Sequence, residues 1–131
     1  MILLVDSDVL IEVLRGSSVV SDQLKTFHLS GHVLSYSPVT RAELRYGLRP
    51  GEETRVAGLL DRLVCIEIDG EIGEKAGEYL AKYRESHGVQ LGDALIAASV
   101  FRSRSALVTL NRKHYPMPDI LFHDLARVAT P

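Results

Sequence analysis

Cysteine and excess charge of either sign are both scarce in this chain. Its 131 residues include one cysteine, and 15 Lys and Arg nearly balance 17 Asp and Glu, for a formal net charge of −2. A single cysteine excludes an internal disulfide and a cysteine-rich zinc site, and the apolar neighbours of Cys65 predict a buried, inert thiol. Because there is no global basic field, any contact with nucleic acid must come from a local patch.

Long apolar runs are also missing. The N-terminal run ends at Asp6, there is no basic leader, and no segment approaches the ~18 apolar residues of a membrane span. The sequence has no glycine-rich phosphate-binding motif, no repeat and no linker. These absences predict a soluble, cytoplasmic protein with no membrane partner, in which residues 1–131 form a single domain.

Buried strands and amphipathic helices alternate along the chain. Helical spacing of apolar residues predicts a helix after each strand, and several strands are apolar on both faces, as is typical of parallel sheets covered by helices. The sequence therefore predicts an α/β fold: a three-layer α/β/α sandwich around a mainly parallel sheet of four to five strands. The predicted strands are 2–5, 32–35, 64–68 and 106–110, with a short edge strand within 119–122.

Polar side chains follow the predicted strands. Asp6 comes directly after the first strand, Glu43 lies in the helix after the second, and Asn111 follows Thr109 at the end of the fourth. Asp93 begins a helix that is otherwise apolar nearly all round, and burying an unpaired carboxylate there would cost several kcal/mol. Since ligands bind beyond the carboxyl ends of parallel strands, we expect these side chains to gather at one edge of the sheet.

This set of oxygens, without a cysteine or histidine cluster, predicts Mg²⁺ or Mn²⁺ rather than zinc. Such a cation offsets the repulsion among carboxylates and favours hydrolysis of a phosphodiester. A purely structural interpretation remains open for each residue: an N-cap at Asp6 or Asp8, a capping box from Thr40 to Glu43, a first-turn acid at Asp93 and a turn residue at Asn111.

Four segments resemble, in order and at the usual spacing, the motifs of PIN domains, and specifically the VapC-type ribonuclease toxins of bacterial type II toxin–antitoxin pairs. They are residues 4–11 (LVDSDVLI), 40–47 (TRAELRYG), 91–98 (LGDALIAA) and 108–115 (VTLNRKHY). The resemblance implies an endoribonuclease that depends on Mg²⁺ or Mn²⁺, is commonly a homodimer, and is neutralised by a cognate antitoxin. DNA would be contacted only indirectly, through that antitoxin.

Position by position, the resemblance implies that Asp6 and Asp93 are direct metal ligands and that Glu43 completes the metal site. Ser7 and Thr109 match the supporting hydroxyl residues of the family.

Asn111 occupies the fourth catalytic position, where PIN nucleases often carry an acid. An amide keeps an oxygen ligand but removes one negative charge, so the second metal ion is the one put in doubt, and Asp119 is a candidate to compensate. His114 has no role in this scheme. A cationic rim for the phosphate backbone is expected from Arg41, Arg45, Arg112 and Lys113.

Three other functions compete with this interpretation. A haloacid-dehalogenase-type phosphotransferase would use Asp6 and Asp8 as nucleophile and acid, although the expected glycine-containing turn is missing. A response-regulator receiver would need Asp69 as its phosphoacceptor. An inactive RNA-binding module would keep the PIN fold but lack activity because of Asn111.

Overall fold

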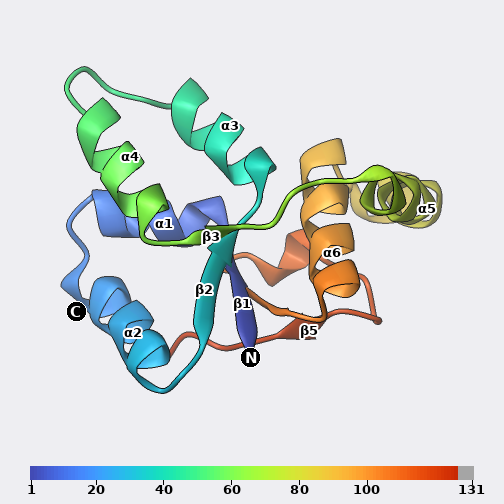
Figure 1. The fold of residues 1–131 in the computed structure, drawn as a ribbon. Coiled ribbons are helices and arrows are strands. Elements are labelled where there is room, and N and C mark those ends of the chain that lie inside the picture. The colour runs from blue at the N-terminus through green and yellow to red at the C-terminus, as the bar shows by residue number, and fades with distance from the viewer. Residues whose placement is uncertain (127–131) are drawn as a thin grey trace.

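The computed structural model describes residues 1–126, so residues 127–131 of the predicted single domain lie outside the described part (Figure 1). Within that part, no helix combines the length and apolar character needed to cross a bilayer. The elements, in chain order, are β1 (Ile2–Val5), α1 (Ser7–Leu14), α2 (Ser18–Leu29), β2 (Val33–Tyr36), α3 (Pro38–Tyr46), α4 (Glu53–Asp61), β3 (Val64–Cys65), α5 (Gly70–His87), α6 (Leu91–Ser103), β4 (Ala106–Val108), the 3-10 turn η1 (Arg112–His114) and β5 (Leu121–Phe122).

The five strands form one parallel sheet in the order β3-β2-β1-β4-β5. The first strand of the chain is thus the central one, with Leu4 opposite Ser35 on one side and Leu107 on the other. Because all strands run the same way, their carboxyl ends meet at one edge, where β1 leads into α1 and β4 into η1.

Helices cover both faces of the sheet, which confirms the predicted α/β/α sandwich. Leu3 and Val5 point into a core shared with α1–α4, whereas Leu4 points into a second core shared with α5 and α6. Figure 1 shows α1–α4 on one side of the strands and α5 and α6 on the other. This alternation follows from the two-residue period of a strand, and all three side chains are fully buried.

The helix that carries Glu43 begins earlier than a capping box at Thr40 would require. Ser37 is the N-cap of α3, its Oγ accepting from the amide of Val39 at 3.1 Å, and Pro38 occupies the first helical position. Thr40 is fully buried inside the first turns. The capping-box interpretation is therefore wrong, and the Glu43 side chain is left for other contacts.

Several predicted bounds are too long. The third strand pairs only over Val64–Cys65, and the fourth ends at Val108, because the following turn leaves the sheet to reach the carboxylates described below. Cys65 is half-buried rather than buried, since β3 is an edge strand.

Candidate active site

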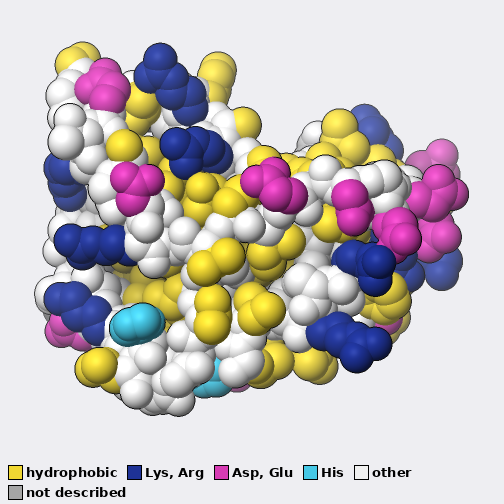
Figure 2. Space-filling model, viewed as in Figure 1, with side chains coloured by type: hydrophobic (Ala, Val, Ile, Leu, Met, Phe, Trp, Pro, Cys, Tyr) yellow, Lys and Arg dark blue, Asp and Glu magenta, His cyan; other side chains and the backbone are white. Residues whose placement is uncertain are grey.

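A pocket of about 450 Å³ lies at the carboxyl edge of the sheet, between α3 and α6. In Figure 2 it corresponds to the hollow in the upper edge of the molecule, between the lobe of α3 and α4 and the lobe of α5 and α6. The titratable and amide side chains that face it come from four separate stretches of the chain and include Asp6, Asp8, Glu43, Asp93, Asn111 and His114. The structure thus brings together all four predicted catalytic residues.

Asp6 is the most enclosed of these acids, with 6% of its surface exposed. Its Oδ1 accepts from the backbone amide of Ser7 at 2.9 Å, so it also acts as the N-cap of α1. Its Oδ2 accepts from two hydroxyls, Thr109 Oγ1 at 2.9 Å and Tyr115 Oη at 2.8 Å. The N-cap interpretation and the site interpretation of Asp6 are therefore compatible, because the single hydrogen bond that caps α1 leaves Oδ1 able to accept a further partner.

Asp8 is not an N-cap; it lies in the first turn of α1 and faces the turn after β4. Its Oδ2 accepts from Thr109 Oγ1 at 3.3 Å and from the amide of Leu110 at 3.2 Å. Its Oδ1 is buried and has no hydrogen-bond partner within the described residues. Burial, and then the charge of Asp6, raise the pKa of Asp8 to about 6.

Glu43 reaches the pocket from the last turns of α3. Its Oε1 accepts from Ser7 Oγ at 3.3 Å, which gives the predicted supporting hydroxyl a contact in the site. Burial raises the pKa of Glu43, and the charge of Asp6 raises it further. The Glu43 carboxylate is thus near enough to Asp6 for the two to repel each other.

Asp93 lines the opposite wall, at the start of α6. Its Oδ2 accepts from the backbone amide of Gln90 at 3.1 Å, and its Oδ1 lies 3.8 Å from His114 Nδ1. The other ring nitrogen of His114 is 3.1 Å from Asn111 Nδ2. Burial raises the pKa of Asp93, while His114 opposes that change. Asp93 is therefore the first-turn acid that the structural interpretation expected, bonded back to the amide of the N-cap residue Gln90, and it also faces the pocket.

The chemistry of these groups fits a hard divalent cation. The carboxylates raise one another's pKa, and one buried carboxylate oxygen, Oδ1 of Asp8, has no hydrogen-bond partner within the described residues. The site is therefore rich in oxygen ligands and lacks a balancing positive charge. Within residues 1–126, however, no three His, Cys, Asp or Glu side chains are placed to hold one ion together. Asp93 is turned toward Gln90 and Glu43 toward Ser7, so the carboxylates are neighbours rather than a preformed cage.

The predicted cationic rim is only partly present. Arg41 donates to the hydroxyl of Tyr36 at 3.1 Å, and Arg45 is exposed on α3. Arg112 pairs with Asp124, and its guanidinium lies 4.5 Å from the centre of the Phe122 ring. Neither Arg41 nor Arg45 lines the acidic pocket.

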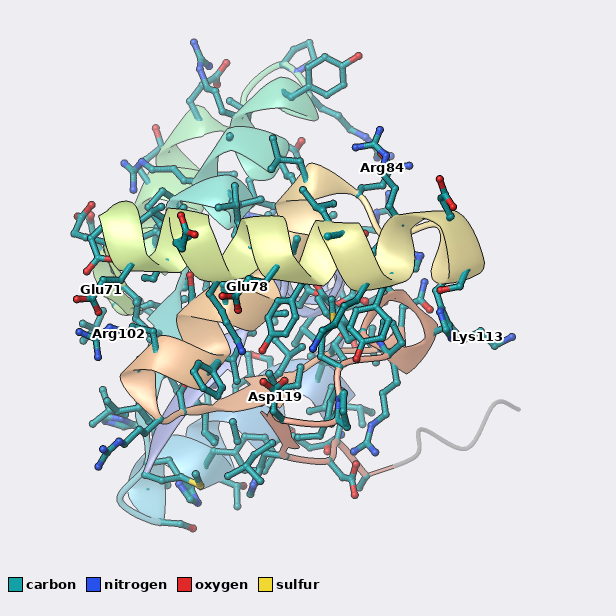
Figure 3. All side chains as sticks on the ribbon, turned by 90° about the vertical axis from the view of Figure 1, so that its right-hand side faces the viewer. Glu71, Glu78, Arg84, Arg102, Lys113 and Asp119 are labelled. Atoms are coloured by element: carbon teal, nitrogen blue, oxygen red, sulfur yellow. The ribbon has the colours of Figure 1, made fainter. Side chains whose placement is uncertain are left out.

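Lys113 has the clearest access to the site region. It lines a second hollow of about 830 Å³ that adjoins the acidic pocket at Asn111, and it is exposed. Figure 3 shows its side chain extended away from the ribbon. Arg112 lines the same hollow, so this side of the pocket carries the cations best placed for a phosphate backbone.

Asp119 does not compensate for Asn111. It lies beneath α5 (Figure 3), where its carboxylate accepts from Tyr79 Oη at 2.7 Å and pairs with Lys75 Nζ at 3.0 Å. These contacts lower the pKa of Asp119 against the opposing effect of its burial. Asp69 is also outside the pocket, because it caps α5 through the amide of Ile72, so the receiver interpretation is wrong.

Two residues of the site were missed or misjudged in the sequence. Tyr115 was taken only as part of a motif, and His114 was given no role, yet both line the pocket. Tyr115 is buried, and burial followed by the charge of Asp6 raises its pKa, so its hydroxyl stays protonated as a donor. The only available signal was their position within three and four residues of Asn111, on the turn that follows the fourth strand.

Solved structures with the same fold are toxin–antitoxin complexes. VapBC2 from Rickettsia felis, bound to a DNA fragment from the promoter, superimposes with a TM-score of 0.82 at 21% identity, covering 95% of this chain and 98% of that one. A toxin–antitoxin complex from Klebsiella pneumoniae gives a TM-score of 0.73 at 22% identity, covering 91% and 95%. At these identities the similarity is evidence of the fold.

Sequence comparisons identify the family. Ribonuclease VapC10 from Mycobacterium tuberculosis is 40% identical over 116 residues, which are 88% of this chain and 86% of that protein. Ribonuclease VapC19 from the same organism is 29% identical over 119 residues, covering 89% and 95%. The haloacid-dehalogenase interpretation is therefore wrong. Because the family model of the PIN domain matches residues 3–119, the chain belongs to the PIN domain family.

Proposed function

We propose that this protein is a metal-dependent endoribonuclease, the toxin of a toxin–antitoxin pair, which hydrolyses phosphodiester bonds in RNA with Mg²⁺ or Mn²⁺. The observation that carries the proposal is the acidic pocket, in which four carboxylates from three helices and a strand end face one open hollow. The ribonucleases VapC10 and VapC19 are the relatives that point to RNA as the substrate.

In this proposal Asp6, Glu43 and Asp93 hold the cation, and Asp8 adds a fourth charge beside them. The cation would supply Lewis-acid polarisation of the phosphate and of the attacking water. A cation would also remove the mutual repulsion that raises the pKa values of Asp8 and Glu43. The resulting attraction to the cation would draw together carboxylates that, without a cation, turn toward backbone amides and hydroxyls.

The chain itself orients the reacting groups. Thr109 holds the carboxylates of Asp6 and Asp8 in place through one hydroxyl, and the amide of Asn111 in turn donates to that hydroxyl at 3.1 Å. Asn111 lines both the acidic pocket and the hollow of Lys113, and so forms the wall between them. An RNA backbone crossing this wall would place one phosphate over the acids and a neighbouring one beside Lys113.

The partner in this proposal is a cognate antitoxin. A separate, apolar groove of about 590 Å³ lies away from the acids, between α1, α2 and α4, and leucines such as Leu29 and Leu59 line it. Lys25 and Arg62 stand at this groove, so an amphipathic helix with acidic residues would complement it in shape and charge.

The test is incubation of the purified, antitoxin-free protein with total cellular RNA and Mn²⁺ or Mg²⁺. We expect discrete cleavage products that disappear in EDTA, and an Asp93→Asn variant slower by about 100-fold or more, because it loses a charge that holds the cation. Asp61→Asn is the matched control, since Asp61 is exposed at the end of α4.

Three outcomes decide the matter. Cleavage lost in Asp93→Asn and kept in Asp61→Asn supports the proposal. Cleavage that persists in EDTA contradicts the dependence on metal. RNA that binds to the folded protein but stays intact with every cation favours an inactive binding module, as the amide at Asn111 would allow.

A further inference from the structure

Tyr115 is a core residue whose one polar atom reaches the acidic pocket. Only 4% of its surface is exposed, and its ring packs in the core formed with α5 and α6. The 3-10 turn η1 ends just before it, and the Tyr115 amide donates to Arg112 O at 2.9 Å. The turn therefore fixes the backbone while the core fixes the ring, so the hydroxyl has little freedom to move.

The hydroxyl completes the hydrogen bonding of one oxygen of Asp6. Each carboxylate oxygen offers about two lone-pair sites. At Oδ2 one site accepts from Tyr115 Oη at 2.8 Å and the other from Thr109 Oγ1 at 2.9 Å. At Oδ1 the described residues supply only the amide of Ser7, which leaves a lone-pair site there.

We propose that Tyr115 is a positioning residue for metal binding: with Thr109 it holds Oδ2 of Asp6 so that Oδ1 is the oxygen presented to a divalent cation. The inference rests on the proposed function, because it assumes that Asp6 binds the ion. Outer hydrogen bonds of this kind orient ligands, and their loss typically weakens metal affinity by about 10-fold to 100-fold.

The chain contains a matched control for this role. Tyr79 is 3% exposed, packs in the same core, and also donates to an aspartate, Asp119, at 2.7 Å. Tyr79 and Asp119 are both absent from the lining of the acidic pocket. Tyr79→Phe and Tyr115→Phe therefore remove the same chemical group from the same core, but only Tyr115→Phe touches Asp6.

The experiment is isothermal titration of Mn²⁺ into the wild type and the two variants, each first shown by urea unfolding in EDTA to be folded. We expect both variants to unfold at lower urea than the wild type, since each leaves a carboxylate without one donor. We expect the Mn²⁺ dissociation constant of Tyr115→Phe to rise by about 10-fold or more, and that of Tyr79→Phe to stay within about twofold of the wild type.

The outcomes separate this inference from the proposed function. Mn²⁺ affinity that is unchanged in Tyr115→Phe, or equally weakened in both variants, would overturn the positioning role and leave the nuclease proposal standing. A wild type that cleaves RNA only with added metal but shows no heat of binding would be titrated by Mn²⁺ electron paramagnetic resonance, with the same two criteria. A folded wild type that binds no Mn²⁺ by either method would overturn both proposals.

Discussion

Asp8 is a residue whose charge lowers the stability of the fold while it adds to the acidic pocket. Its pKa is raised from 3.8 to about 6, first by burial and then by Asp6. When folding raises the pKa of an acid, the acid contributes its full stabilisation only at pH values below its pKa in the unfolded state. That stabilisation is lost as the pH rises through its pKa in the folded state. At pH 7 in the absence of metal, the native protein therefore carries an unfavourable charge at Asp8.

We accordingly predict that Asp8→Asn is more stable than the wild type at pH 7 in EDTA. The gain is about 1 kcal/mol after allowance for solvent screening, because Asp8 is only partly buried. It should vanish at about pH 3, below the unfolded pKa of 3.8, where the wild-type carboxyl is largely protonated in both states. Urea unfolding of the variant and the wild type at pH 7 and at pH 3 measures the gain, and a gain that is no larger at pH 7 than at pH 3 would contradict the prediction.

Residues differ in how far their roles could be predicted from the sequence. Asp6 and Asp93 stood out because a carboxylate at a strand end or in an apolar helix needs a partner. Asp8 was read as a helix cap, since Asp near a helix start is common for that reason alone. Tyr115 could not be assigned, because only the folded turn after β4 brings its hydroxyl, more than a hundred positions away in sequence, to Asp6.

Among the elements, the start of α6 lies unusually close to α3. A methyl group built on Gly92 would lie 3.3 Å from Cγ1 of Val39, so Val39 would have to move by a few tenths of an ångström to admit a side chain there. Glu43 and Asp93, two acids of the pocket, stand on these same two helices.

We predict opposite effects from the same substitution in two helices. Gly77→Ala in α5 meets open space and should raise the free energy of unfolding by about 0.5–1 kcal/mol through helix propensity. Gly92→Ala should raise the free energy of unfolding by less than Gly77→Ala does, or should lower it, and it should weaken Mn²⁺ binding. Urea unfolding and Mn²⁺ titration of both variants measure this; equal gains with unchanged binding would show that the α3–α6 contact does not set the site.

Element types were easier to predict than element ends. Periodicity gave the order of strands and helices because burial alternates with the period of each structure. The ends of the elements depend on contacts that the spacing of apolar residues does not reveal. The turn at Thr109, which bonds to Asp6, shortens β4, and the N-cap at Ser37 starts α3 before Thr40. Strand order is likewise a property of the assembled sheet.

For the molecule as a whole, the proposal places the groove that docks the antitoxin away from the acidic pocket. We predict that Leu29→Glu, which places a charge in the apolar groove, lowers the affinity for the antitoxin by about 10-fold or more and leaves RNA cleavage unchanged. Leu29 is 84% exposed, so the fold should tolerate the change.

Val19→Glu is the matched control, because Val19 is also exposed on α2 but does not line the groove. The measurement is the affinity of each variant for the protein encoded beside this one, with cleavage of total RNA as the second readout. Equal antitoxin affinity in the wild type and Leu29→Glu would place the partner on another surface.

The two outermost strands of the sheet, β3 and β5, are only two residues long. An exposed strand edge is a template for pairing with another chain, and its hazard grows with its length. Such short edges offer few unpaired backbone groups, so cross-β polymerisation has little on which to nucleate. A cell could therefore accumulate the protein without losing it to fibrils.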